Sequence, residues 1–314
     1  MEVDMSEQTA SPSTTSEERL LVALAHGSVI LSFFGPIVPA LVWTFQRRKS
    51  PYVAFHALQA IGYQMLTFWV GMAAYLLFVL VFMLIAIPLM GFAASNSRFE
   101  MTPFILQGSM FFFMFGFMGI YVLFGIVGAV SCLLDKDFKY PILGKWLEKY
   151  LGRGASPTDP LDADKEDQWM AAMGHASAIL LMWGLFTPFA IWLTQKDSSP
   201  RLRYQSLQAV IYQLFAVAGY FVFMALYMFM FFALFAGAIL MSGSPQDSTG
   251  AIFVFVFFGI MLIFMLAFAL AIPTYHLFAM IAGIQVAKGK DYHYPLLGKF
   301  LARRMGNQPP PSAD

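Results

Sequence analysis

Apolar residues run through this chain in long stretches that are almost free of charge, separated by short polar segments. Four stretches contain no Asp, Glu, Lys or Arg: residues 50–97, 101–134, 204–245 and 251–287. Each exceeds the ~20 apolar residues that a helix needs to cross a bilayer. None shows the alternation over ~10 residues that is typical of a transmembrane barrel. The pattern therefore predicts an all-α, polytopic membrane protein embedded in a lipid bilayer.

The same pattern of apolar and polar positions occurs twice. "SPYVAFHALQAIGYQ" at 50–64 matches "SPRLRYQSLQAVIYQ" at 199–213, and "KDFKYPILGKWL" at 136–147 matches "KDYHYPLLGKFL" at 290–301. Matches in the same order over both halves indicate a tandem duplication. The predicted division is a disordered acidic tail at 1–18, a first membrane repeat at 19–151, an acidic linker at 152–167, a second repeat at 168–306 and a disordered tail at 307–314.

Each repeat follows one plan. An apolar stretch broken by Gly and Pro comes first, at 20–45 and 169–194. A Ser-Pro pair then opens the first of two long transmembrane helices, because Ser is a favoured N-cap and Pro suits the first helical position. After a Tyr-Pro pair, "PILGKWLEKYLG" and "PLLGKFLARRM" place apolar residues at helical spacing with charged residues opposite. We expect both to be amphipathic helices lying on the membrane surface; the alternative is a helix packed on the protein.

The basic residues decide whether the broken stretch crosses the membrane or dips in and returns. In a re-entrant arrangement, only Arg98 of the 19 Lys and Arg residues lies away from the cytoplasm. A full crossing divides them almost evenly, against the positive-inside rule. Residues 20–34 and 36–46 also give helices of roughly 22 and 16 Å at 1.5 Å per residue, short of the ~30 Å hydrocarbon core. We expect a re-entrant hairpin in each repeat, with both termini in the cytoplasm and the chain in the inner cell membrane.

Polar side chains recur at the start of the apolar helices and in the broken stretches. The candidate intramembrane cluster comprises His26, Ser28, Gln59, Tyr63, Gln64, His175, Ser177, Gln208, Tyr212 and Gln213. A buried amide costs a few kcal/mol unless it is hydrogen-bonded. We interpret the Gln and Tyr side chains as partners for the His and Ser residues and for carbonyls freed at the hairpin break. The alternative is a hydrated substrate path lined by the same residues.

Other candidate chemistry is sparse. Met110, Met114 and Met118 form a helical stripe that could bind Cu(I), although Met is also common packing material. His276 is intramembrane by position and is interpreted as a neutral, hydrogen-bonded residue. No nucleophile–base pair, phosphate loop or His/Cys metal spacing occurs, and the single Cys132 excludes an all-Cys cluster. The sequence therefore predicts no enzyme, no metal and no cofactor, and a net charge of +1 gives no case for nucleic acid.

The segment "EERLLVALAHGSVILSFFGPIVPALVWTFQRRKSPYVAFHALQAIGYQ" resembles domain-of-unknown-function family 4870, a family of bacterial membrane proteins. The pattern is Ala-His-x-Ser, a broken apolar stretch, a basic Ser-Pro turn and a later Tyr-Pro, and it fits both halves. His56 fits the usual His after Ser-Pro, whereas the second half has Gln205 there. The family is distantly similar to the twenty-kilodalton subunit of the chloroplast inner-envelope translocon (Tic). That resemblance implies a protein-conducting or assembly role by analogy.

The function expected from these observations is a non-enzymatic scaffold, assembly factor or translocon-like component, partnered by other membrane proteins. The alternative is a channel or transporter with a polar path between the two repeats.

Overall fold

The computed structural model describes residues 14–94, 102–241, 248–295 and 297–304. The helices of the first repeat are α1 (Ser16–Gly27), η1 (Ser28–Phe34), α2 (Ile37–Gln46), α3 (Pro51–Ala94), α4 (Thr102–Leu133) and α5 (Leu143–Tyr150). Those of the second are α6 (Ala163–Ala176), η3 (Ser177–Leu185), α7 (Phe186–Gln195), α8 (Pro200–Met241), α9 (Ser248–Ala287) and α10 (Leu297–Arg304).

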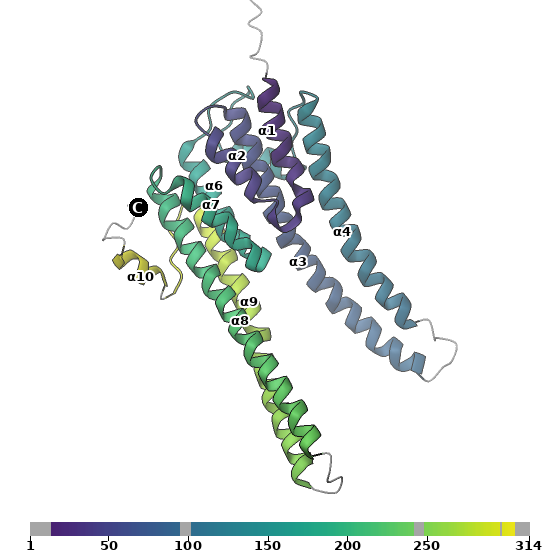
Figure 1. Cartoon of the computed structure of the whole chain (residues 1–314). Coiled ribbons are helices and arrows are strands. Elements are labelled where there is room, and N and C mark those ends of the chain that lie inside the picture. Colours follow the sequence, from purple (N-terminus) through teal and green to yellow (C-terminus); the bar gives the residue numbers. More distant parts are fainter. Residues whose placement is uncertain (1–13, 95–101, 242–247, 296, 305–314) are drawn as a thin grey trace, which may run out of the picture.

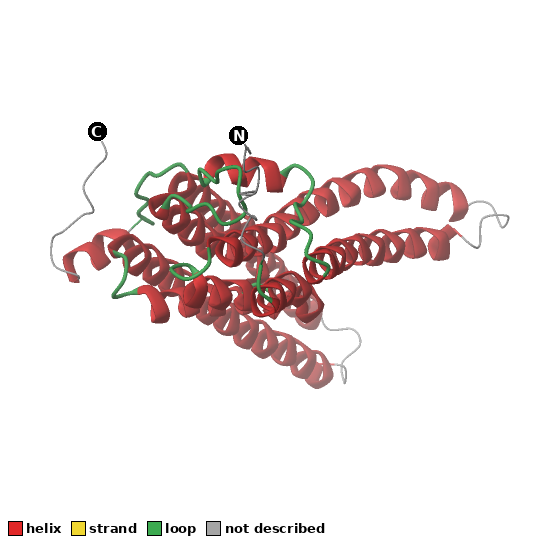
Figure 2. Ribbon diagram, turned by 90° about the horizontal axis from the view of Figure 1, so that it is seen from above, coloured by secondary structure: helices red, strands yellow, loops and turns green. Residues whose placement is uncertain are grey.

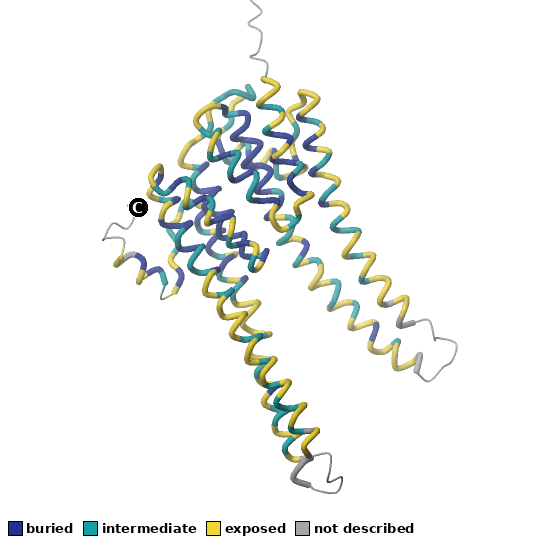
Figure 3. Tube along the Cα trace, viewed as in Figure 1, coloured by how far each residue is buried: buried dark blue, intermediate teal, exposed yellow. Residues whose placement is uncertain are grey.

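The helices form one packed region from which two long hairpins diverge, as Figures 1 and 2 both show. One hairpin is α3 with α4 and the other is α8 with α9. Buried residues concentrate where the short helices pack against the starts of the long ones, and exposed residues dominate the hairpins beyond that region (Figure 3). The exposed side chains of the hairpins are largely Phe, Leu, Ile, Val and Met. Such surfaces suit lipid, since a monomeric soluble protein rarely exposes so much contiguous apolar area.

Five helical segments are long and apolar enough to cross a membrane: Pro51–Phe92, Gln107–Leu133, Ala163–Gln195, Pro200–Gly237 and Ile252–Ala287. They confirm a polytopic helical membrane protein. The segment Ala163–Gln195 is not straight, however. It consists of α6, η3 and α7 with a break at Leu181, where φ is 53° and ψ is −129°. Its counterpart Ser32 in η1 has φ 52° and ψ −116°.

The backbone reverses at each of these breaks. Arg19 in α1 lies 3.9 Å from Asp135, which directly follows α4, so the start of α1 and the end of α4 share one end of the molecule. Arg47, just after α2, pairs with Asp167 near the start of α6 at 2.6 Å. α3 begins three residues after Arg48. The start of α1 and the end of α2 therefore lie at the same end of the molecule as the start of α3 and the end of α4. The two arms therefore form a helical hairpin whose ends lie at the same end of the molecule.

Two helices begin earlier than the predicted boundaries. α1 starts at Ser16, because Thr15 and Glu18 form a capping box in which each side chain accepts from the other's backbone N–H. α6 starts at Ala163, inside the segment expected to be a linker, because Asp162 caps its first turn. The tails predicted at 1–18 and 307–314 otherwise lie outside the described residues, which exclude 1–13 and 305–314.

The amphipathic segments form α5 and α10, but α5 packs largely on protein. Leu147 and Leu151 are fully buried, whereas Trp146 is half exposed. The Tyr150 hydroxyl donates to the carbonyl of Ala287 in α9 at 2.7 Å. The apolar face that was expected to meet lipid therefore covers the first repeat and reaches the second. In α10, Leu301 is buried and Phe300 is exposed.

The two repeats meet in a continuous apolar core. The indole N–H of Trp169, in α6, donates to the carbonyl of Leu58, in α3, at 2.9 Å. The indole N–H of Trp43 donates to the buried Glu166 carboxylate at 2.7 Å. The cluster around these residues contains buried side chains from both repeats, including Ile61, Met65, Met170 and Met173.

The repeats contribute unequally to this seam. α3 packs against α6 and η3 of the second repeat. Met65 of α3 is fully buried there, while its counterpart Leu214 in α8 is 52% exposed. Likewise Trp169 is 2% exposed, whereas its counterpart Leu20 in α1 is 54% exposed. The seam thus covers a face of α3 that stays open on α8.

Candidate functional site

In the first repeat, Gln64 of α3 binds the break in the hairpin. Its amide Nε2 donates to the Ser28 hydroxyl at 2.9 Å and to the Ala25 carbonyl at 3.3 Å. Ser28 also donates to the Ala25 carbonyl at 2.8 Å. A Cβ on Gly35 would lie 2.6 Å from the Gln64 Oε1, so glycine is what lets the amide approach this closely. Gln64 therefore occupies the position expected of a partner for irregular backbone.

The second repeat repeats this arrangement. Gln213 Nε2 donates to the Ser177 hydroxyl and to the Gly174 carbonyl, both at 3.1 Å. The Ser177 hydroxyl also donates to the Gly184 carbonyl at 2.9 Å, which ties the two arms of the hairpin together. A Cβ on Gly184 would lie 2.0 Å from the Ser177 carbonyl oxygen, so no other residue fits without a backbone shift.

Gln59 has a different partner from the one expected. Its Nε2 donates to the Phe138 carbonyl at 3.1 Å, and its Oε1 accepts from the Tyr140 backbone N–H at 2.9 Å. It therefore holds the extended segment after α4, and both of these hydrogen bonds lie away from the hairpin break. The sequence could not show this, because that segment lies some eighty residues further along the chain. The second repeat has the same contacts among Gln208, Tyr292 and Tyr294.

Tyr63 also binds outside the hairpin. Its hydroxyl donates to the Tyr121 carbonyl of α4 at 2.9 Å. Its ring stacks on Tyr140, with the ring centroids 3.8 Å apart. Tyr212 does the same with Tyr275 and Tyr294. The Tyr residues thus join each long hairpin to the segment that follows it.

The histidines form a chain of hydrogen bonds in the first repeat. His26 Nδ1 lies 3.0 Å from the Tyr140 hydroxyl, and His26 Nε2 lies 3.2 Å from His56 Nδ1. His56 Nε2 lies 3.0 Å from an Asp137 carboxylate oxygen. A carboxylate only accepts, so a neutral His56 donates from Nε2 and accepts from His26 at Nδ1. His26 in turn accepts from Tyr140, and every ring nitrogen is satisfied.

Asp137 anchors this chain from outside the membrane-spanning segments. Arg153 binds the carboxylate at 3.1 Å and stacks on the Phe55 ring, 3.9 Å from its centroid. Burial alone would raise the pKa of Asp137, but the hydrogen bond from His56 and the charge of Arg153 hold that pKa well below its usual range. Asp137 is therefore a carboxylate at neutral pH.

The second repeat keeps part of this chain and replaces the rest. His175 Nδ1 lies 3.1 Å from the Tyr294 hydroxyl, as in the first repeat. Its Nε2 lies 3.0 Å from Oε1 of Gln205, which stands where the first repeat has His56. Gln205 thus satisfies the same histidine without a second imidazole.

One group of metal-ligating atoms lies within this network. The ligand atoms of His26, His56 and Cys132 are all within 4.8 Å of one another, and all three residues are fully buried. The sequence predicted no metal spacing because these residues come from three different helices. The available signal was the comparison of repeats, since Gln205 and Val286 replace His56 and Cys132 in the second.

The remaining sequence candidates do not gather into a site. Met114 is 43% exposed on α4, so the Met stripe faces outward in part. The His276 Nδ1–H donates to the Ile272 carbonyl of its own helix at 2.9 Å, and its ring meets Trp69 edge-on.

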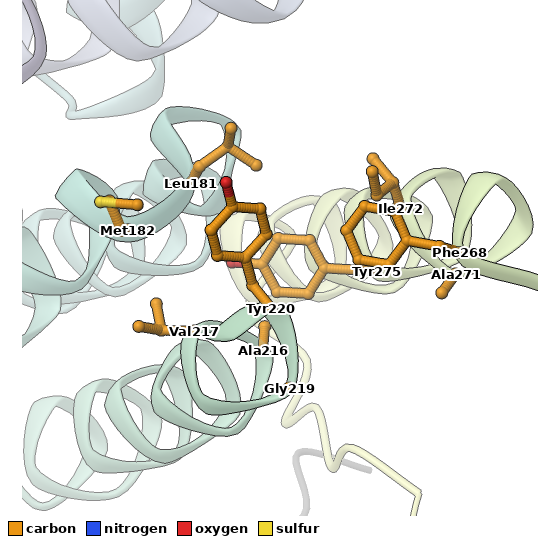
Figure 4. Close-up of a pocket in the computed structure, with 10 residues that line it drawn as sticks. All are labelled: Leu181, Met182, Ala216, Val217, Gly219, Tyr220, Phe268, Ala271, Ile272 and Tyr275. Carbon is orange, nitrogen blue, oxygen red and sulfur yellow. The ribbon is translucent and has the colours of Figure 1, made fainter. Parts of the chain in front are cut away.

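An apolar pocket of about 390 Å³ opens between η3, α8 and α9 (Figure 4). The break residue Leu181 forms part of one wall, and Tyr220 and Tyr275 lie on the helices opposite. Its walls are almost entirely apolar, and none of the residues that line it carries a charge.

Comparison with known proteins gives one match. The family model MamF_MmsF, described as the magnetosome magnetite crystal formation protein family, matches residues 17–147 and again residues 166–301. No curated protein and no solved structure matches the chain.

This match corrects the resemblance drawn from the sequence to domain-of-unknown-function family 4870 and to the chloroplast translocon. The features that carried that resemblance were a broken apolar stretch, a Ser-Pro helix start and a Tyr-Pro turn. Helix breaks at Gly and Pro, Ser-Pro helix starts and Pro turns occur in helical proteins generally, so they do not identify a family. The two matched ranges also confirm the tandem duplication. The chain belongs to the magnetosome magnetite crystal formation protein family, and it carries two tandem copies of the family's domain.

Proposed function

We propose that the protein is a non-enzymatic scaffold or assembly component of the magnetosome membrane, which acts in magnetite crystal formation by holding its two repeats in a fixed arrangement. The observation that carries this proposal is the packed seam between the repeats. Leu58, Ile61 and Met65 of the first repeat are fully buried against α6 of the second. Close packing of this kind resists relative movement of the two halves.

The buried polar side chains support the same conclusion. The side-chain amides of Gln59, Gln64 and Gln213 donate to backbone or hydroxyl groups of their own repeat. Gln208 donates to the Tyr292 carbonyl and to the Gln205 side chain, also within its own repeat. A polar path between the repeats would need such groups to face the seam. Among the described residues they face inward instead: Gln64 and Gln213 hold the hairpin breaks, and Gln59 and Gln208 hold the segments that follow the long hairpins.

We propose a topology in which the packed end of the molecule faces the cytoplasm and each broken hairpin enters the membrane and returns. The clustering of Lys and Arg at that end supports it. The test uses the protein expressed in the cytoplasmic membrane of a host bacterium, in a Cys132→Ser background. A cysteine at Ser156 should resist a membrane-impermeant maleimide in intact cells and react after permeabilisation, and one at Asn96 should react from outside. Strong labelling of the Ser156→Cys protein in intact cells contradicts this topology.

A disulfide across the seam tests the scaffold directly. Thr44 of α2 and Thr194 of α7 approach with their hydroxyl oxygens 3.3 Å apart, so Thr44→Cys/Thr194→Cys can be oxidised to link the repeats. Cys132 is retained because it is fully buried. Purified protein in vesicles is assayed for flux of ferrous ions and protons, with the link formed and with it reduced.

We expect no flux above protein-free vesicles in either state. Flux through the reduced protein that stops when the disulfide forms would contradict the scaffold proposal and would indicate a transporter whose halves move.

In a magnetosome-forming cell, deletion of the gene should change the number or size of the magnetite crystals seen by electron microscopy, and the wild-type gene should restore them. Unchanged crystals in the deletion strain contradict a role in crystal formation.

A further inference from the structure

Three buried side chains from three helices meet in the first repeat with their metal-ligating atoms inward. His26 comes from α1, His56 from α3 and Cys132 from α4. His26 Nε2 and His56 Nδ1 are 3.2 Å apart, and the Cys132 Sγ is 3.9 Å from His56 Nδ1. A tetrahedral zinc ion, with Zn–N of about 2.0–2.1 Å and Zn–S of about 2.3 Å, holds its ligand atoms roughly 3.3–3.6 Å apart. Small side-chain adjustments convert the observed group into that geometry.

The outer contacts of both imidazoles are those of metal-bound histidines. His56 presents its other nitrogen, Nε2, to the Asp137 carboxylate at 3.0 Å. His26 presents Nδ1 to the Tyr140 hydroxyl at 3.0 Å. A metal-ligating histidine typically donates its second N–H to such a partner, which fixes the tautomer and orients the ring.

We propose that His26, His56 and Cys132 form a binding site for one divalent ion of the Zn²⁺ class. Nitrogen and thiolate ligands favour such ions over harder ones. On binding, the thiol of Cys132 loses its proton to solvent. The His26 proton moves from Nε2 to Nδ1, and the Nδ1–H then donates a hydrogen bond to the Tyr140 hydroxyl oxygen. The thiolate then offsets one positive charge of the ion, and the Asp137 carboxylate, which also pairs with Arg153, faces the ion through His56.

The second repeat is a natural comparison without the site. His175 and Tyr294 keep their hydrogen bond, but Gln205 and Val286 replace the other two ligands. The fold therefore does not require an imidazole or a thiol at these two positions. The residues that differ between the repeats are two of the three that would bind the metal. This observation does not depend on the proposed scaffold function.

The test measures metal binding to the purified protein in detergent. We expect one Zn²⁺ per chain by elemental analysis, and Co²⁺ should give thiolate-to-metal charge-transfer absorption. His56→Gln and Cys132→Val install the residues of the second repeat, so both should fold, and each should weaken metal binding at least about tenfold. His276→Gln, which changes a buried histidine elsewhere, should leave the stoichiometry unchanged.

A gain of function completes the test. Gln205→His/Val286→Cys should raise the stoichiometry to two ions per chain, with the same cobalt absorption. The proposal is overturned if the wild-type protein binds no more metal than His56→Gln/Cys132→Val while both melt at the same temperature. Equal charge-transfer absorption in the wild type and the Cys132→Val variant would overturn it as well, because the absorption would then not come from this thiolate.

Discussion

Replacing Gln59 with Leu removes both hydrogen bonds that hold the segment after α4 against α3. The change leaves the Tyr140 N–H and the Phe138 carbonyl without their protein partner. The Tyr140 N–H is buried, so it carries a full desolvation cost of roughly 1–3 kcal/mol, whereas the partly buried Phe138 carbonyl carries about 1 kcal/mol. The two costs together give an expected loss of stability of about 2–4 kcal/mol.

The assay is the thermal midpoint of the purified protein in mild detergent. A loss of this size lowers Tm by roughly 3–6 °C in a chain of this length. Gln107→Leu is the matched control, since Gln107 is exposed at the start of α4 and should leave Tm nearly unchanged. Gln59→Glu should melt lower still, because an ionised carboxylate cannot donate to the Phe138 carbonyl and is buried.

The reasoning fails if Gln59→Leu melts like Gln107→Leu. It also fails if Gln59→Glu is as stable as the parent protein, because a tolerated charge would mean that water reaches the amide. Either result would favour a hydrated path lined by this residue over a structural role.

Three further changes test the hairpins and the anchoring carboxylate by the same melting assay. Gly184→Ala should cost about 2–3 kcal/mol or more, because its Cβ would overlap the Ser177 carbonyl, whereas Gly219→Ala, with no neighbouring atom within 4 Å, should be neutral or stabilising. Leu181→Gly should raise stability by about 1 kcal/mol, since φ of 53° is strained for Leu and free for Gly, and a lower Tm would contradict that strain. Asp137→Asn should lower Tm at neutral pH. The difference from the parent protein should shrink as the pH falls below 3.8, the ordinary pKa of the group, because the stability that comes from a depressed carboxyl pKa is lost on protonation. A Tm difference that stays constant across pH would contradict this role of the carboxylate.

The sequence predicted those features that depend on local pattern. Long uncharged stretches identified the membrane helices, and polar residues beside a Gly/Pro break led to the interpretation that Gln side chains partner groups at the break, as the Gln64–Ser28 hydrogen bond does. The capping box at Thr15 and Glu18 was equally local, and the predicted tail boundary at residue 18 overlooked it.

Features that depend on distant contacts could not be predicted in the same way. Gln59 binds a segment whose path is set by the end of α4, and nothing near Gln59 records that path. His26, His56 and Cys132 meet only because three helices converge. The family resemblance was wrong for a related reason. It rested on helix breaks and turn residues, which reflect the course of the backbone and do not identify a family.

The unequal seam has a consequence for assembly. A contact that uses the same face on both partners is isologous, and it closes after two copies. Here Met65 of α3 is covered by the second repeat, while its counterpart Leu214 on α8 is open, and Leu20 on α1 is open where its counterpart Trp169 is covered. Equivalent helices do meet in the seam, since α2 packs against its counterpart α7, but the contacts of α3 have no equal on α8. The seam is therefore only partly isologous, and the faces around Leu214 and Leu20 remain open for contacts outside it.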